Sequence, residues 1–120
     1  MRDELRRLLL LPLLLSVLTA GAQEPPEVWG FGVKPCRDYL ATFERWQQGE
    51  EAAIADYLRY RGWLAGLVTG LSLATGQGVL KGVEMDGAMR RIQVNCDERP
   101  DDDFFNASMS LIRRLSGLGG

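Results

Sequence analysis

The hydrophobic and polar residues of the chain follow a helical period from Pro35 onward. Apolar positions recur every three or four residues in four stretches, as expected for helices that each bury one face. The pattern predicts a first helix from Pro35 to a stop at Gly49 and a second, longest helix over roughly residues 50–75. A third helix follows its predicted N-cap at Asp86, and a fourth follows the three aspartates 101–103. We therefore expect an all-α domain of four helices, with short loops between antiparallel neighbours.

Residues 23–33 precede these helices and lack their periodicity. The pair Pro25-Pro26 interrupts any regular helix at the start of the segment. Apolar side chains then alternate at Trp29, Phe31 and Val33, which is typical of extended backbone with one side facing a core. The sequence thus predicts an extended N-terminal arm laid over the helical domain.

The first 22 residues have the composition of an export signal. A positively charged start is followed by an almost unbroken aliphatic run over residues 8–18, and then by Ala20 and Ala22 at the positions that a signal peptidase reads. We predict cleavage before Gln23, which leaves a single domain of residues 23–120 in an exported, periplasmic protein. The aliphatic run is about half the length that spans a bilayer, and no cysteine follows it as a lipid acceptor, so we expect no membrane anchor after cleavage.

The only two cysteines, Cys36 and Cys96, lie at the edges of the first and third predicted helices. Because an exported protein meets an oxidising compartment, we expect them to form one disulfide. Closing a loop of this length is worth roughly 4 kcal/mol in the chain-entropy description, a large share of the stability of a small domain. Two free thiols or a bridge between two molecules are the alternatives.

Two glycine-containing segments are the candidates for packing and for binding. Gly62, Gly66 and Gly70 recur every four residues in the longest predicted helix, and we expect this face to admit another helix at close range, the alternative being a kink or break near Gly66. The glycine-rich segment 76–82 holds few expected core residues. Its apolar and basic side chains therefore form a candidate partner-binding loop, with a passive linker as the alternative. These side chains are Val79, Leu80 and Lys81.

Charge and composition exclude several classes of function. The chain contains no histidine, which removes Ser-His-Asp and Cys-His catalysis and the usual zinc sites. Without residues 1–22 the count of basic residues falls to 11 and that of acidic residues to 14, a net charge of −3 that gives no reason to expect nucleic acid as a partner. We expect neither a metal nor a cofactor. The sequence favours a protein that binds another protein over an enzyme.

Three motifs in order resemble the Rap/Tai immunity proteins of bacterial type VI secretion systems. They are CRDYL at 36–40, YRGWLAG at 60–66, and Cys96 followed by Pro100. The resemblance covers about two thirds of residues 23–120, and this chain departs from it by having Asn95 before the second cysteine and no histidine near the proline. The resemblance implies a helical periplasmic inhibitor that blocks a peptidoglycan amidase by protein–protein contact, with a second copy of the chain as a further partner.

Two other functions remain open on the sequence. The chain has a more distant similarity to periplasmic acid-stress chaperones of the HdeA type, which are also small, helical and disulfide-bonded. In that case Asp97, Glu98 and the aspartates 101–103 would supply an acid trigger, because carboxylates lose their charge below about pH 3 to 4. The remaining alternative is a periplasmic binding domain with an unrelated role.

Overall fold

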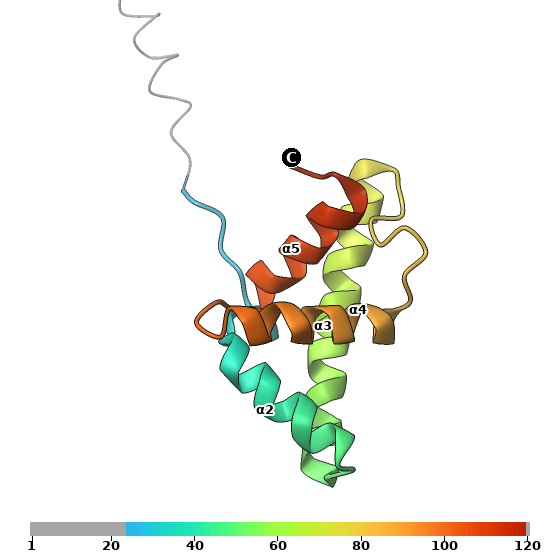
Figure 1. The fold of residues 1–120 in the computed structure, drawn as a ribbon. Helices are drawn as coiled ribbons and strands as arrows, with labels where there is room; N and C mark the ends of the chain where they lie inside the picture. The colour runs from blue at the N-terminus through green and yellow to red at the C-terminus, as the bar shows by residue number, and fades with distance from the viewer. Residues whose placement is uncertain (1–23, 120) are drawn as a thin grey trace, which may run out of the picture.

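The computed structural model describes residues 24–119 and confirms the all-α prediction (Figure 1). The predicted signal peptide, 1–22, lies outside these residues. A single 3-10 turn and four α-helices follow one another in the described part of the chain. They are η1 (Gly30–Val33), α2 (Cys36–Gln47), α3 (Glu51–Thr75), α4 (Met85–Glu98) and α5 (Phe104–Ser116).

The helix ends follow the local sequence in most places. Gly49, with φ +77°, makes the tight turn between α2 and α3, and Gly76 ends α3 in the left-handed conformation that glycine adopts without strain. Asp103 caps α5 by accepting a hydrogen bond from the backbone N–H of Asn106 at 2.7 Å, as the sequence predicts. The predicted cap of the third helix is wrong. Asp86 lies inside the first turn of α4, which follows Glu84 without any side-chain cap.

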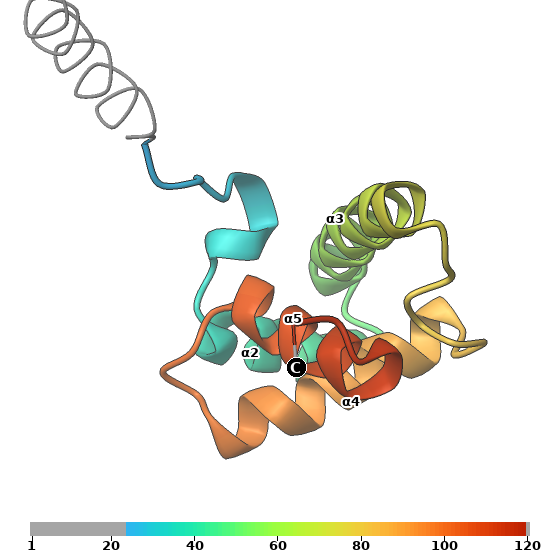
Figure 2. The ribbon, with the colours of Figure 1, turned by 90° about the horizontal axis from the view of Figure 1, so that it is seen from above.

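The long helix α3 organises the other elements. The preceding helix α2 packs along its first half, and α4 crosses α3 and also contacts α2 (Figure 1). Viewed from above, α3 lies on one side of the molecule and α2, α4 and α5 on the other (Figure 2). The described α3 runs without interruption through Gly66, so the alternative of a break there is wrong.

Aromatic rings fill the junction of these helices. The ring of Tyr39 in α2 meets that of Tyr60 in α3 at 4.9 Å and that of Phe104 in α5 at 4.8 Å between centroids. All three side chains are buried, and edge-on pairs of this kind add about 0.5–1.5 kcal/mol each beyond the area that they remove from water. The rings thus fix how three helices meet.

The N-terminal arm lies over this core, with one difference in its conformation. Residues 24–29 have no regular structure, whereas Gly30–Val33 form the 3-10 turn η1 instead of extended backbone. Phe31 packs edge-on against Tyr60 at 4.8 Å, and the indole N–H of Trp63 donates to the carbonyl of Trp29 at 2.8 Å. Gly32 lies so close to the indole of Trp63 that any Cβ would overlap the ring. The arm is therefore held by Trp63, with the Trp29 side chain left exposed.

Candidate functional site

The predicted disulfide joins the first residue of α2 to the last turn of α4. Cys36 and Cys96 are bonded to each other and fully buried, with their Cα atoms 5.0 Å apart. The chain that leads into α5 is held at the same place, since the N–H of Cys36 donates to the carbonyl of Asp102 at 2.7 Å and the N–H of Phe104 donates to that of Lys34 at 2.9 Å. The disulfide thus belongs to a rigid end of the molecule where the ends of three helices meet.

The predicted packing of Gly62, Gly66 and Gly70 against another helix is wrong. A Cβ built on any of the three would meet nothing within 4 Å, and all three residues are exposed. The four-residue spacing places them near one another on α3, but that part of the helix is turned to solvent. Their lack of a side chain is not required by any neighbour in the described part of the chain.

Gly66→Ala is therefore expected to raise the free energy of unfolding by up to about 1 kcal/mol, because alanine has the higher helix propensity and finds open space. Thermal unfolding followed by circular dichroism measures the change. Gly66→Leu serves as the second variant, and we expect it not to lower the melting temperature. A marked loss of stability in the leucine variant would place an unseen neighbour against this face.

The predicted partner-binding loop is corrected in two of its three residues. Val79 and Leu80 have exposed fractions of 0% and 8% and belong to the hydrophobic core, so neither is available to a partner. Tight turns bring them inward, with the N–H of Lys81 donating to the carbonyl of Gly78 at 3.1 Å and that of Val83 to the carbonyl of Leu80 at 3.0 Å. Lys81 alone is exposed, at a positive φ of 51°.

The glycines instead form part of an exposed, uncharged side of α3. We define the outer face of α3 as the exposed residues that recur every three or four positions along its solvent side. These are Leu58, Gly62, Gly66, Thr69, Gly70 and Leu73. Leu58 is 57% exposed and Leu73 is 81% exposed, and the sequence has no charged residue from Gly62 to Leu80. A solvent-facing helix side with large apolar and small residues, and no charge over three turns, is unusual for a surface that meets only water.

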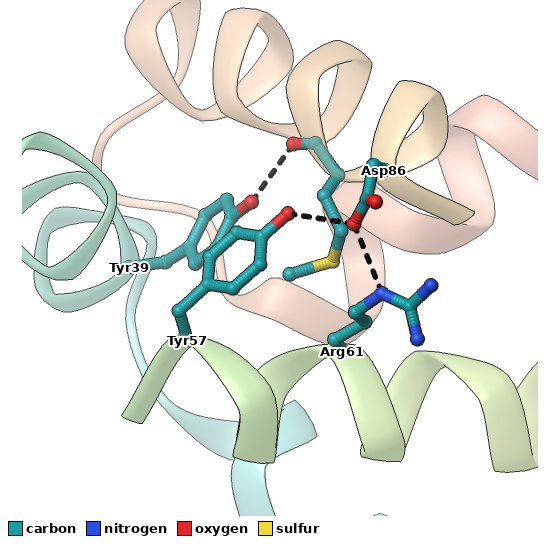
Figure 3. Close-up of polar contacts among 5 residues, drawn as sticks. Tyr39, Tyr57, Arg61 and Asp86 are labelled. Carbon is teal, nitrogen blue, oxygen red and sulfur yellow. Dashed lines mark hydrogen bonds and ion pairs between the residues drawn. The ribbon is translucent and has the colours of Figure 1, made fainter. Parts of the chain in front are cut away.

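A polar cluster that the sequence analysis missed connects α3 to α4. The Asp86 carboxylate lies between two residues of α3, accepting from the phenol of Tyr57 at 3.2 Å and from Nε of Arg61 at 2.9 Å (Figure 3). Beside it, the phenol of Tyr39 donates to the backbone carbonyl of Met89 at 2.8 Å. Tyr57 and Arg61 are four residues apart and so share a helix face, but nothing in their spacing identifies the distant carboxylate that they meet.

At neutral pH the groups of this cluster are in the protonation states that allow them to hold α3 and α4 together. Burial, followed by the charge and hydrogen bond of Asp86, raises the pKa of Tyr57 to about 12, so the phenol stays protonated at neutral pH. The hydrogen bond from Arg61 holds the pKa of the Asp86 carboxyl below its ordinary value. Because the pKa of Asp86 is lower in the folded than in the unfolded protein, its ionised carboxylate stabilises the fold at any pH above its pKa in the unfolded protein. This stabilisation is lost as the pH falls through the pKa that Asp86 has in the folded protein. The α3–α4 joint is thus sensitive to acid.

Residues 24–119 contain no group of three or more histidine, cysteine, aspartate or glutamate residues that could hold a metal ion. None of the helices described for this chain is long and apolar enough to cross a membrane. No protein-family model, curated protein or solved structure matches the chain.

Proposed function

We propose that this chain is an exported binding protein that inhibits a peptidoglycan amidase by direct contact, as the Rap/Tai immunity proteins do. The observation that supports a binding role is the outer face of α3, which offers two large apolar side chains and no charge on a scaffold held by a disulfide. The resemblance of the three sequence motifs supports the choice of an amidase as the partner. The contact surface proposed is the outer face.

The composition of the outer face is that of the centre of a protein interface. Charged residues are depleted at such centres, because the hydration free energy lost by an unpaired charge exceeds the free energy gained from its contacts. Burying Leu58 and Leu73 fully would contribute about 1.5–3 kcal/mol each. Gly62 and Gly66 lie between them with open space above, so the partner's backbone can approach α3 closely there.

The test is inhibition of a type VI amidase effector acting on purified peptidoglycan. The parent chain is expected to inhibit the release of peptide, and the double variant Leu58→Asp, Leu73→Asp is expected to bind at least tenfold more weakly, a change of about 1.4 kcal/mol. Val94→Asp is the matched control, because Val94 is 53% exposed but belongs to α4. Both variants should keep the melting temperature of the parent within a few degrees, since all three side chains are exposed.

Two results would contradict this proposal. Equal inhibition by the parent and the Leu58, Leu73 variant would place the contact elsewhere on the domain. Absence of inhibition, combined with suppression of the aggregation of unrelated proteins at about pH 3, would favour the acid-stress chaperone instead. The acid-sensitive joint at Asp86 is the observation on which that second function would rest.

A further inference from the structure

A cavity of about 240 Å³ that is open to solvent lies between η1, α2 and α3, away from the outer face of α3, and its wall includes the exposed residues Asp38 and Arg45. Four of its lining residues belong to α2 and two to α3, and the other two come from η1 and from the residue that follows it. Its polar lining residues are Lys34, Asp38, Thr42, Arg45, Asp56 and Tyr60. The ring of Phe31 completes the wall, held edge-on against Tyr60. Two basic and two acidic side chains thus surround one small space.

Two of the residues that line this cavity are buried and carry hydroxyl groups. Thr42 is 4% exposed and Tyr60 is 2% exposed, yet neither hydroxyl has a hydrogen-bond partner within residues 24–119. Thr69 and Ser108, by contrast, donate to the carbonyl four residues earlier in their helices, each at 2.7 Å. Every side-chain oxygen or nitrogen that is sealed from solvent in the described residues is hydrogen-bonded, so the Thr42 and Tyr60 hydroxyls keep some contact with solvent.

The charged groups of the cavity fall into a paired set and an unpaired set. Asp56 bonds to Arg59 at 2.7 Å and Arg45 approaches Glu50 at 3.8 Å, so these two have partners outside the cavity. Within the described residues, Lys34 has no carboxylate and Asp38 no cation inside 4 Å. The Lys34 ammonium instead lies 5.1 Å from the centre of the Phe31 ring. One cation and one anion, four residues apart, therefore remain free to meet a ligand.

The carboxylates also act on Tyr60. Burial raises the pKa of Tyr60 above its ordinary value, and the negative charges of Asp38 and Asp56 raise it further, which places both carboxylates near the phenol. The phenol is thus a neutral hydrogen-bond donor at any physiological pH.

We infer that this cavity binds a small zwitterion, a free amino acid or a dipeptide, with its ammonium at Asp38 and its carboxylate at Lys34. The Thr42 and Tyr60 hydroxyls then supply neutral hydrogen bonds between the two charged ends. A phosphate ester fits poorly, because two carboxylates line the same space, and an apolar ligand leaves the free charges unpaired. The inference is independent of the proposed inhibitor function, since it uses a different side of α3.

The volume of this open cavity indicates how much of a ligand it can take up. An apolar cavity of about 150 Å³ accommodates benzene, whereas sites for drug-sized molecules occupy about 300–1,000 Å³. The present cavity falls between these limits and suits a molecule of roughly ten heavy atoms. Alanylalanine and phenylalanine both meet this requirement and differ in where their charged ends lie.

The experiment titrates chain 23–120 with alanylalanine and with phenylalanine, each to about 10 mM, while the backbone amide resonances are recorded by NMR. We expect at least one of the two to shift the resonances of Thr42 and Tyr60. Lys34→Gln and Asp38→Asn are each expected to weaken binding at least tenfold. Arg37→Gln is the matched control, because Arg37 is an exposed neighbour on α2 that pairs with Asp101, and it should bind as the parent does. The Leu58→Asp, Leu73→Asp variant should also bind the zwitterion normally, whether or not the inhibitor function holds.

Three results would overturn the inference. One is the absence of resonance shifts with both probes. Another is equal binding of alanylalanine blocked at both ends, by acetylation and amidation, because charge recognition would then have no part. The last is that both Lys34→Gln and Asp38→Asn bind the zwitterion with the affinity of the parent, while each variant keeps the melting temperature of the parent.

Discussion

Replacement of both Cys36 and Cys96 by serine is expected to lower the free energy of unfolding by about 4 kcal/mol, within a range of 2–5 kcal/mol. The bond closes a loop with a sequence separation of 60, and cutting it restores the freedom of that loop in the unfolded chain. A domain of about 100 residues has only a modest margin of stability, so the loss removes much of it. Equilibrium unfolding in urea, monitored by circular dichroism, measures the difference.

The two single serine variants are the controls for this result. Each removes the same bond, so each is expected to cost nearly as much as the double variant. Treatment of the parent with a reductant should move its unfolding midpoint to that of the double variant. Rapid alkylation of both thiols in the untreated native protein would contradict the buried bond that the structure contains.

The second large effect is expected from the loop between α3 and α4. Serine at both Val79 and Leu80 should lower the free energy of unfolding by about 4 kcal/mol or more, because two buried apolar side chains, each worth about 1.5–3 kcal/mol, are replaced by hydroxyls that must be desolvated. Chemical unfolding of the variant and the parent in parallel gives the difference.

Lys81→Ser is the matched control in the same loop. Lys81 is exposed, and its replacement should change the free energy of unfolding by no more than about 0.5 kcal/mol. If the Val79, Leu80 variant were as stable as the parent, the loop would lie outside the core in solution. A partner-binding role for Val79 and Leu80 would then be supported.

The helices were predictable from the sequence because each one buries a single stripe of side chains. Cys36, Tyr39 and Phe43 in α2 are separated by three and four residues, so a helix places them on one side whereas a strand would not, and all three are buried. The Asp103 cap was equally local, since a cap bonds to a backbone N–H three residues away. The local spacing of residues was therefore sufficient to predict the fold class and most helix ends.

The sequence predicted burial and exposure wrongly for residues whose surroundings come from distant parts of the chain. The spacing of Gly62, Gly66 and Gly70 establishes that they lie near one another, but it does not say whether a neighbour covers them. In the loop, Val79 and Leu80 have no periodic context, so their glycine-rich surroundings suggested exposure when they in fact close the core. A pair of adjacent aliphatic residues between glycines was the available clue to their burial.

The candidate sites were still harder to predict, because their residues come from separate elements. The cavity brings Lys34 from the arm junction, Asp38 from α2 and Tyr60 from α3 to one place. No sequence motif indicates that these three residues come together. The same holds for Asp86, which the sequence suggested as a helix cap and which instead meets Tyr57 and Arg61 on another helix.

The position of the disulfide divides the molecule into a stiff end and a yielding end. Cys36–Cys96 and the backbone bridge between Pro35 and Asp103 fasten one end, whereas the last turn of α3, around Leu73 to Gly76, is exposed. Segments with few buried contacts open locally at a smaller free-energy cost than global unfolding requires. Substitutions at the yielding end therefore cost the fold little, and the chain can change its specificity there during evolution while the stiff end keeps it folded.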